Sequence, residues 1–226
     1  IYAKEDDLIV SAVEKNQPRI VTIFTATQDI TSTPIASGFV VSRDGVIATD
    51  LRGISAELGL RESYKVLLNG KVYIATPMKS DAMGKSSVAL LRISETKETD
   101  VFDAVAFGRQ VDPKVAQTVI VVGGEAGSNV QRGILSRFHY QNPDATSTPK
   151  IISTIDTGFK ILSENAGALV VNLDGQAIGI VVTNNNGTGY TIFPASRIIE
   201  LISTISAEAT KTSAVDEKKK VSASAP

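Results

Sequence analysis

The sequence predicts an all-β globular protein, and three observations support this. Short apolar runs typical of strands recur about every 8 to 12 residues and are bounded by Gly, Pro, Asn and Asp. Asn69-Gly70 and Asp174-Gly175 separate such runs, and these residue pairs tolerate the positive φ angles of tight hairpins. Helical periodicity occurs only near the two ends. A parallel α/β fold would instead alternate strands with helices along the chain.

The two expected helices enclose the expected strands. The first helix, from Asp7 to Asn16, places Leu8 and Ala12 on one face, and the last runs from Ser196, a plausible N-cap, to Ala207. Between them we expect strands at Arg19–Ile23, Gly38–Val41, Val46–Thr49, Lys65–Leu68, Val72–Ala75, Val88–Ile93, Thr118–Val122, Gly133–Ser136, Lys150–Thr154, Ala168–Val171, Ala177–Thr183 and Gly189–Phe193.

The composition excludes several classes of site. The 226 residues contain no cysteine and one histidine, which excludes disulfides, cysteine-ligated zinc, a thiol nucleophile and a histidine-rich metal site. Glu5, Asp6 and Asp7 form an acidic cluster that we expect to be solvated, so no metal and no cofactor is predicted. With 23 Lys and Arg against 24 Asp and Glu, and few aromatic residues, we expect no nucleic-acid partner.

The segment Ser37 to Ile54 (SGFVVSRDGVIATDLRGI) resembles the opening barrel of trypsin-like serine proteases of the HtrA/Deg branch. There a strand follows Ser-Gly, turns at Asp-Gly and runs into Thr-Asn-x-His-Val. Similar likenesses cover Leu8–Ile23, Tyr64–Ile93, Phe107–Phe138 and Ile152–Ile199, in all about five-sixths of the chain. The resemblance implies a chymotrypsin/trypsin-like double six-stranded antiparallel β-barrel with short terminal helices.

The same resemblance implies a division of the chain. We expect a lead-in helix at 1–16, the first barrel at 17–94, a connection at 95–106, and the second barrel with the last helix at 107–207. Residues 208–226 are polar, lack apolar periodicity and are expected to be a disordered tail. HtrA relatives often continue into a PDZ domain at this point.

Carried onto this sequence, the family's catalytic positions hold unsuitable residues. Arg52 stands in place of the histidine base and cannot accept a proton, and Ser87 stands in place of the aspartate that orients it. Ala166 stands in place of the nucleophilic serine, and Glu164 with Asn165 fills the oxyanion-hole loop, where a carboxylate would repel the developing charge. The resemblance therefore implies a pseudoprotease with no intact catalytic residue.

Two alternatives stay open. An active serine endopeptidase would need another base, for which His139 is the single histidine, or a Ser163–Lys160 dyad. A purely structural ectodomain of a membrane assembly would need neither catalysis nor a groove.

As a binding, scaffolding or regulatory domain, the chain would use the family's substrate groove, since strand addition needs only backbone. We expect Ile178, Ile180, Val182, Thr183 and Tyr190 to bind a peptide or protein, for example an active protease paralogue. The pocket near Thr157–Leu162 and Gly189–Phe193 would hold a side chain. Family members are usually secreted, periplasmic or membrane-tethered, so an extracytoplasmic location with an anchor outside this chain is expected.

Overall fold

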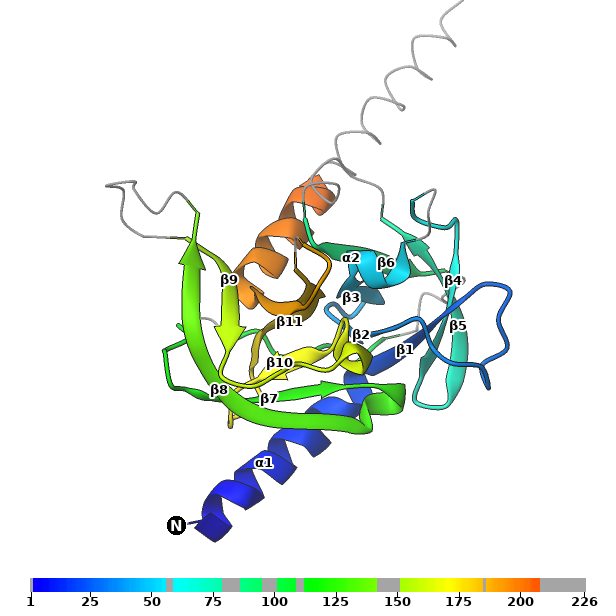
Figure 1. Cartoon of the computed structure of the whole chain (residues 1–226). Helices are drawn as coiled ribbons and strands as arrows, with labels where there is room; N and C mark the ends of the chain where they lie inside the picture. The colour runs from blue at the N-terminus through cyan, green and yellow to red at the C-terminus, as the bar shows by residue number, and fades with distance from the viewer. Residues whose placement is uncertain are drawn as a thin grey trace, which may run out of the picture.

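Two closed antiparallel β-barrels, each of six strands, form the body of the computed structural model (Figure 1). The structure describes residues 2–55, 59–78, 86–94, 101–108, 112–141, 151–184 and 186–207. The predicted double barrel is confirmed. The turn-rich segment 142–149 and the tail 208–226 singled out from the sequence lie outside the described residues.

The first barrel closes in the order β1-β2-β3-β6-β5-β4. Its strands are β1 (Ile20–Thr25), β2 (Ala36–Val40), β3 (Val46–Asp50), β4 (Tyr64–Leu68), β5 (Lys71–Pro77) and β6 (Val88–Ile93). The β4–β5 hairpin turns at Asn69 and Gly70, whose φ angles of 50° and 75° fit the Asn-Gly signal in the sequence. A four-residue helix, α2 (Leu51–Ile54), follows β3 directly.

The second barrel closes in the order β10-β11-β12-β9-β8-β7. Its strands are β7 (Thr118–Gly123), β8 (Asn129–Tyr140), β9 (Ile152–Thr157), β10 (Leu169–Val171), β11 (Ala177–Thr183) and β12 (Tyr190–Pro194). The sequence predicted only Gly133–Ser136 of β8, which runs for 12 residues. Its outward positions hold exposed residues such as Arg132, so the strand lacks a long apolar run.

Alternating side chains on the second barrel fill two different cores. On β7, Val119 and Val121 point into the second barrel, whereas Ile120 and Val122 join the larger core that contains the first barrel. This is the two-residue period of a strand with both faces buried. The second barrel therefore offers one face of its strands to the seam between the barrels.

The connection between the barrels packs against both of them. Phe102 N–H donates to Arg43 O at 3.0 Å, and Ala177 N–H donates to Ala106 O at 3.0 Å. Phe102 and Val105 are buried. The described part of the connection, 101–108, thus fixes the barrels relative to each other.

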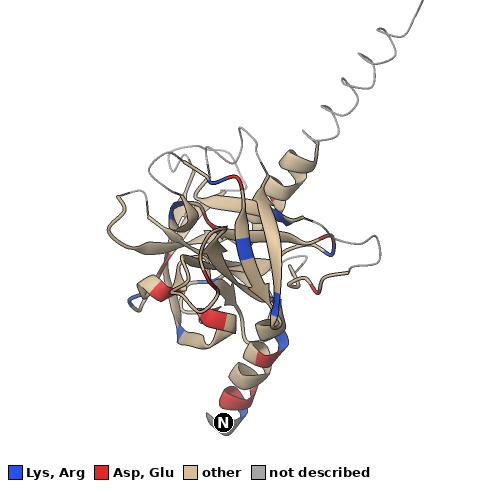
Figure 2. Ribbon diagram, turned by 90° about the vertical axis from the view of Figure 1, so that its right-hand side faces the viewer, with Lys and Arg blue, Asp and Glu red and all other residues tan. Residues whose placement is uncertain are grey.

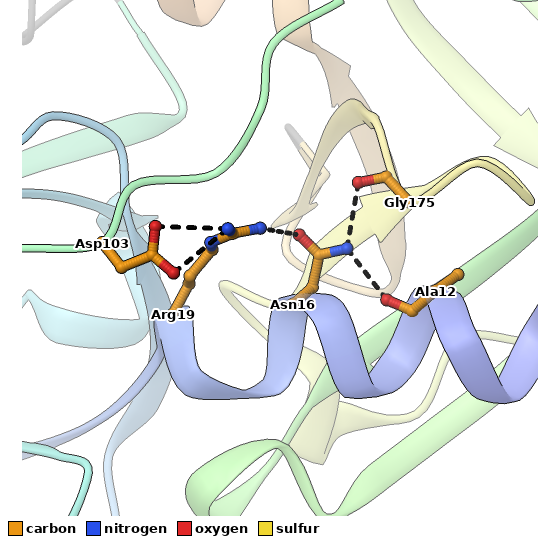
Figure 3. Close-up of polar contacts among 5 residues, drawn as sticks. All are labelled: Ala12, Asn16, Arg19, Asp103 and Gly175. Atoms are coloured by element: carbon orange, nitrogen blue, oxygen red, sulfur yellow. Dashed lines mark hydrogen bonds and ion pairs between the residues drawn. The ribbon is translucent and has the colours of Figure 1, made fainter.

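The lead-in helix α1 (Tyr2–Asn16) projects from the body at its N-terminal end and is anchored at its C-terminal end (Figure 1). Buried Asn16 donates through Nδ2 to Ala12 O at 2.9 Å and to Gly175 O, in the β10–β11 hairpin, at 3.0 Å. Arg19, in the short η1 (Gln17–Arg19), donates to Asn16 Oδ1 and pairs with Asp103 at 3.1 Å (Figure 3). This cluster joins the helix, the second barrel and the connection.

The C-terminal helix spans residues 195–207, close to the predicted 196–207, and buries Ile198, Leu201 and Ile205 in the larger core. The helix already includes Ala195, so Ser196 lies within its first turn and is not the N-cap that the sequence suggested. Basic and acidic side chains are interspersed over the body rather than gathered by sign (Figure 2). Glu5, from the acidic cluster in α1, pairs with Arg132 of β8. Among the described residues, no helix is long and apolar enough to cross a membrane.

Candidate functional site

The candidate site is built around the end of β3. The carboxylate of Asp50 caps α2 by accepting a hydrogen bond from Gly53 N–H at 3.0 Å. Leu51 N–H donates to Ser87 O at 2.9 Å, which holds the backbone just before β6 against the start of α2. Arg52 and Ser87, distant in sequence, thus belong to adjacent segments. Arg52 reaches toward the 186–189 turn, where a Cβ added to Gly187 would lie 2.9 Å from its Nη1.

Asp50 also crosses the seam to the second barrel. Its Oδ1 accepts from Thr183 N–H at 3.1 Å, and its Oδ2 accepts from Thr183 Oγ1 at 2.6 Å. The residue is fully buried. Burial raises the pKa of the Asp50 carboxyl, and the hydrogen bonds from Thr183 and Gly53 counter that rise only in part. Asp50 therefore joins the two barrels through hydrogen bonds from Gly53 and Thr183, and we call this contact the polar lock. It was not identified from the sequence.

Ala166 lies on the opposite side of the seam, directly after the one-turn helix η3 (Ser163–Asn165). Ser37 N–H of β2 donates to Ala166 O at 3.0 Å, and Gly167 N–H donates to Val181 O at 2.9 Å. Gly167 has φ of 81°, and a Cβ there would lie 1.9 Å from Ser37 O. Only glycine allows this close approach of the loop to the first barrel.

Two backbone N–H groups of this loop donate to carbonyl groups of the loop itself. Ala166 N–H donates to Ser163 O at 3.1 Å, and Asn165 N–H donates to Leu162 O at 3.1 Å. A side-chain network fixes the same loop from β8: Gln131 Oε1 accepts from Asn165 Nδ2 at 2.7 Å, and Gln131 Nε2 donates to Lys160 O at 3.3 Å. The Ala166 N–H is therefore engaged within the loop, and the side chain beside it is a methyl group.

Glu164 is exposed and Asn165 is buried, although the two residues are adjacent. The Glu164 carboxylate accepts from Ser163 Oγ at 3.2 Å. No hydrogen bond or ion pair joins Ser163 to Lys160 within the described residues, so the loop contains no assembled Ser–Lys dyad.

A pocket of about 770 Å³ opens beside this loop. Its walls come from β8, β9, residues 159–164 and residues 188–190. The size lies within the range of small-ligand and side-chain pockets. This is the region that the sequence indicated as a side-chain pocket, and Tyr190 is part of its wall.

The expected peptide-binding positions on β11 need correction. Ile178, Ile180 and Val182 are at most 2% exposed and lie in the cores, so they do not face a groove. β11 is hydrogen-bonded to β10 on one side and to β12 on the other, because the barrel closes and leaves no free edge there. Thr183 is engaged with Asp50.

His139 lies on β8, and its Nε2 is within hydrogen-bonding distance of Asp156 Oδ2 on β9, at 2.8 Å. Both residues line a small pocket of about 190 Å³ that also contains Ser87 and Thr183. Ser163, the serine of the loop, lines the large pocket instead. The histidine thus has a carboxylate partner but lies on a different pocket from Ser163.

Residues 36–180 match the family model of the trypsin-like peptidase domain. The chain is 27% identical to serine protease HTR4 of Bos taurus over 223 residues, which cover 94% of this chain and 44% of that protein. Serine protease HTRA3 of Homo sapiens is 29% identical, covering 74% and 37% respectively. A probable periplasmic serine endoprotease DegP-like of Halomonas elongata is 30% identical, covering 65% and 28%.

The chain therefore spans less than half the length of these curated relatives. The matched segment includes the end of β3 and the loop that contains Ala166. The double barrel, the family match and the likeness to these serine proteases agree: the chain belongs to the trypsin-like peptidase domain family and is related to its HtrA/Deg members.

Proposed function

We propose that this HtrA-like domain is catalytically inactive and acts by binding a segment of another protein. The observation that carries the proposal is the loop at Ala166. Its side chain offers no nucleophile, and its N–H donates to Ser163 O at 3.1 Å instead of pointing toward a reacting carbonyl. Both the attacking group and an oxyanion donor are then missing from the place where the family needs them.

The base position supports the same proposal. Arg52, assigned to this position by resemblance, has a guanidinium group with hydrogen-bond donors and no acceptor, so it cannot serve as a base. Ser87 lies beside α2 and has no carboxylate with which to stabilise an imidazolium. With base, orienting residue and nucleophile all replaced, one substitution cannot restore proteolysis, because triad members act as a unit.

Binding remains available because the neighbouring pocket stays open. Its volume of about 770 Å³ persists despite the presence of Glu164 in its rim. Gln131 holds the loop through Lys160, Leu162 and Asn165, so the pocket wall is ordered before any ligand arrives. Preorganised walls reduce the entropy lost on binding. We propose a protein or peptide partner, such as an active protease paralogue whose activity this domain would regulate.

We place this activity outside the cytoplasm, with the domain tethered to a membrane by a segment outside this chain. The name of the DegP-like relative, a probable periplasmic endoprotease, supports the location outside the cytoplasm, whereas the tether is proposed only from the resemblance to the HtrA/Deg family.

The test exposes the purified protein to a fluorophosphonate probe and to casein, with a catalytically active HtrA protease as the positive control. We expect neither labelling nor cleavage. Labelling mapped to Ser163 or Ser87, lost on substitution of that serine or of His139, would show instead an active serine endopeptidase with a rearranged site. The variant Ala166→Ser restores a hydroxyl group at the nucleophile position and is tested beside the unmodified protein. It shows whether the loop can support catalysis once a serine is present.

A further inference from the structure

The charged side chains that line the pocket of about 770 Å³ indicate which kind of ligand side chain it would bind. Two cationic residues, Arg137 of β8 and Lys160 of the loop, line it together with two carboxylates, Asp156 and Glu164. The residues available to a ligand are those that the protein does not already engage. The contacts of the four side chains therefore decide which ligand the pocket accepts.

Both carboxylates already have partners within the chain. Asp156 lies directly across the β8–β9 ladder from Arg137, but its carboxylate pairs with His139 at 2.8 Å. Glu164 accepts a hydrogen bond from Ser163 Oγ. Within the described part of the chain, neither Arg137 nor Lys160 forms an ion pair. Arg137 and Lys160 are therefore the charged side chains of the wall that have no ion-pair or side-chain hydrogen-bond partner among the described residues, although both carboxylates keep their negative charge.

The rest of the wall suits an extended side chain that ends in a carboxylate. Phe159, Ile161 and Tyr190 supply apolar surface, and Ser136 and Thr188 supply hydroxyl groups. The Phe159 ring packs on Gly133, where a Cβ would lie 1.9 Å from it, and Thr157 Oγ1 donates to Phe159 O at 2.6 Å. Both contacts fix the turn that carries Lys160.

A smaller pocket, the second hollow, lies next to the large one on the other side of the loop at Ser163 and Glu164. It encloses about 200 Å³ between residues 33–37 and residues 124–125, and Ser163 with Glu164 lines both hollows. A bound chain can therefore continue past the pocket instead of ending in it. Glu125 and Glu164 line this second hollow, which disfavours another acidic residue there.

We propose that the large pocket selects an Asp or Glu side chain within an extended segment of the partner protein, through Lys160 and Arg137. This inference rests on the proposed function, because it names the ligand of the same pocket. Lysine binds a carboxylate as a point charge, whereas arginine can bind both oxygens at once.

Short peptides titrated into ¹⁵N-labelled protein test the proposal. The series Ac-Ala-Ala-Xaa-Leu-Ala-NH₂ has Glu, Gln, Lys or Leu at Xaa, and Ac-Ala-Ala-Leu-OH presents a free C-terminal carboxylate. Amide shifts in residues 159–163 and 188–190 report binding. At low salt we expect the Glu peptide to bind about 3- to 10-fold more tightly than the Gln peptide, the range of partly exposed ion pairs, with the difference shrinking as salt rises.

Variants then assign the preference to particular charges. Lys160→Gln and Arg137→Gln should each reduce the Glu-over-Gln ratio about 2- to 5-fold, and Asp156→Asn should raise it, because an opposing carboxylate is removed. Lys71→Gln, an exposed lysine on β5 of the other barrel, changes net charge equally and should leave the ratio unchanged. Circular dichroism checks that each variant is folded.

Each outcome has a separate consequence. Equal or tighter binding of the Leu or Gln peptide would overturn the acidic preference while leaving a peptide-binding pocket. Tighter binding of the free C-terminal carboxylate than of internal Glu would overturn the choice of an internal side chain. If no peptide shifts these amides, both the acidic preference and the proposed binding at the pocket fail.

Discussion

Replacing Asp50 by alanine should destabilise the contact between the barrels. The buried carboxylate accepts hydrogen bonds from Gly53 N–H at 3.0 Å, Thr183 N–H at 3.1 Å and Thr183 Oγ1 at 2.6 Å, and the Arg52 backbone N–H donates to it as well. Losing the helix cap costs about 1 kcal/mol. Each Thr183 donor left without an acceptor at the seam costs about 1–3 kcal/mol.

These losses total roughly 3–7 kcal/mol, and removing a buried charge offsets part of them. We expect Asp50→Ala to lower the free energy of unfolding by about 2–4 kcal/mol. For a domain of this size, that corresponds to a fall in Tm of roughly 4–16 °C. Urea and thermal unfolding followed by circular dichroism measure both quantities.

Asparagine at the same position separates the hydrogen bonds from the charge. Its one acceptor oxygen and one NH₂ group can satisfy some of these partners but not all, since Thr183 Oγ1 is able to accept as well as donate whereas the backbone N–H groups only donate. Asp50→Asn should therefore cost clearly less than Asp50→Ala. A double-mutant cycle of Asp50→Ala with Thr183→Val should show coupling of about 1–3 kcal/mol. An alanine variant within about 0.5 kcal/mol of the wild type, or a cycle without coupling, would refute the lock.

The difference in unfolding free energy between the wild type and Asp50→Asn should depend on pH, and the structure predicts the direction. Burial raises the pKa of Asp50 in the folded protein above its unfolded value. The folded state then binds the proton more tightly, so the stability linked to this proton is complete below the unfolded pKa of about 3.9 and is lost as pH rises through the folded pKa. The advantage of the wild type over Asp50→Asn should shrink from acid toward neutral pH in the same unfolding assay. An advantage that grows over this range would contradict the direction of the shift.

Three further predictions concern the seam, the helix anchor and catalysis. Gly167→Ala should lower the free energy of unfolding by at least about 3 kcal/mol or prevent folding, because a Cβ would lie 1.9 Å from Ser37 O. Gly70→Ala is the control: its φ is 75° and no atom lies within 4 Å of the added Cβ, so it measures the backbone strain alone, about 1–2 kcal/mol. Equal melting points for the two variants would contradict the clash. Asn16→Ala should cost about 1–3 kcal/mol in urea unfolding by leaving Gly175 O unpaired, against a smaller effect of Lys15→Ala at the exposed end of the same hairpin contact. Ala166→Ser should give no measurable peptidase activity on fluorogenic peptides; even with Arg52→His and Ser87→Asp added activity should stay poor, and adding Glu164→Gly should raise it most, since one oxyanion donor is worth about 10²–10³ in rate.

The sequence predicted the strands well where local pattern determines them. The runs at Val88–Ile93 and Ala177–Thr183 match β6 and β11 residue for residue, because their apolar, β-branched content and flanking turns leave little choice. β8 was predicted only in part, since polar residues such as Arg132 occupy its exposed positions. α2 has four residues, too few to show helical periodicity.

The site was less accessible to sequence reasoning because its contacts are long-range. Asp50 and Thr183 are 133 positions apart, and nothing local identifies them as partners. One feature of the sequence could have identified Asp50. It directly follows the apolar run Val46–Thr49, where a buried carboxylate without a partner would cost stability. The expectation for β11 was wrong in Ile178, Ile180 and Val182 because an unbroken apolar run means that both faces are buried, which leaves no side chain to face a groove.

The hydrogen bonds of the seam also explain how the proposed loss of catalysis and a stable fold fit together. A protease must keep N–H donors at its nucleophile loop available to the transition state, and unsatisfied donors cost stability. Here Ala166 N–H is bonded to Ser163 O, and Asp50 ties β3 to β11. Among the buried side-chain atoms described, only Arg19 Nε and Asn165 Oδ1 lack a hydrogen-bond partner. Nearly every buried polar side-chain atom described is thus hydrogen-bonded within the fold, whereas Lys160 and Arg137 are exposed in the pocket wall, where we propose that the partner binds.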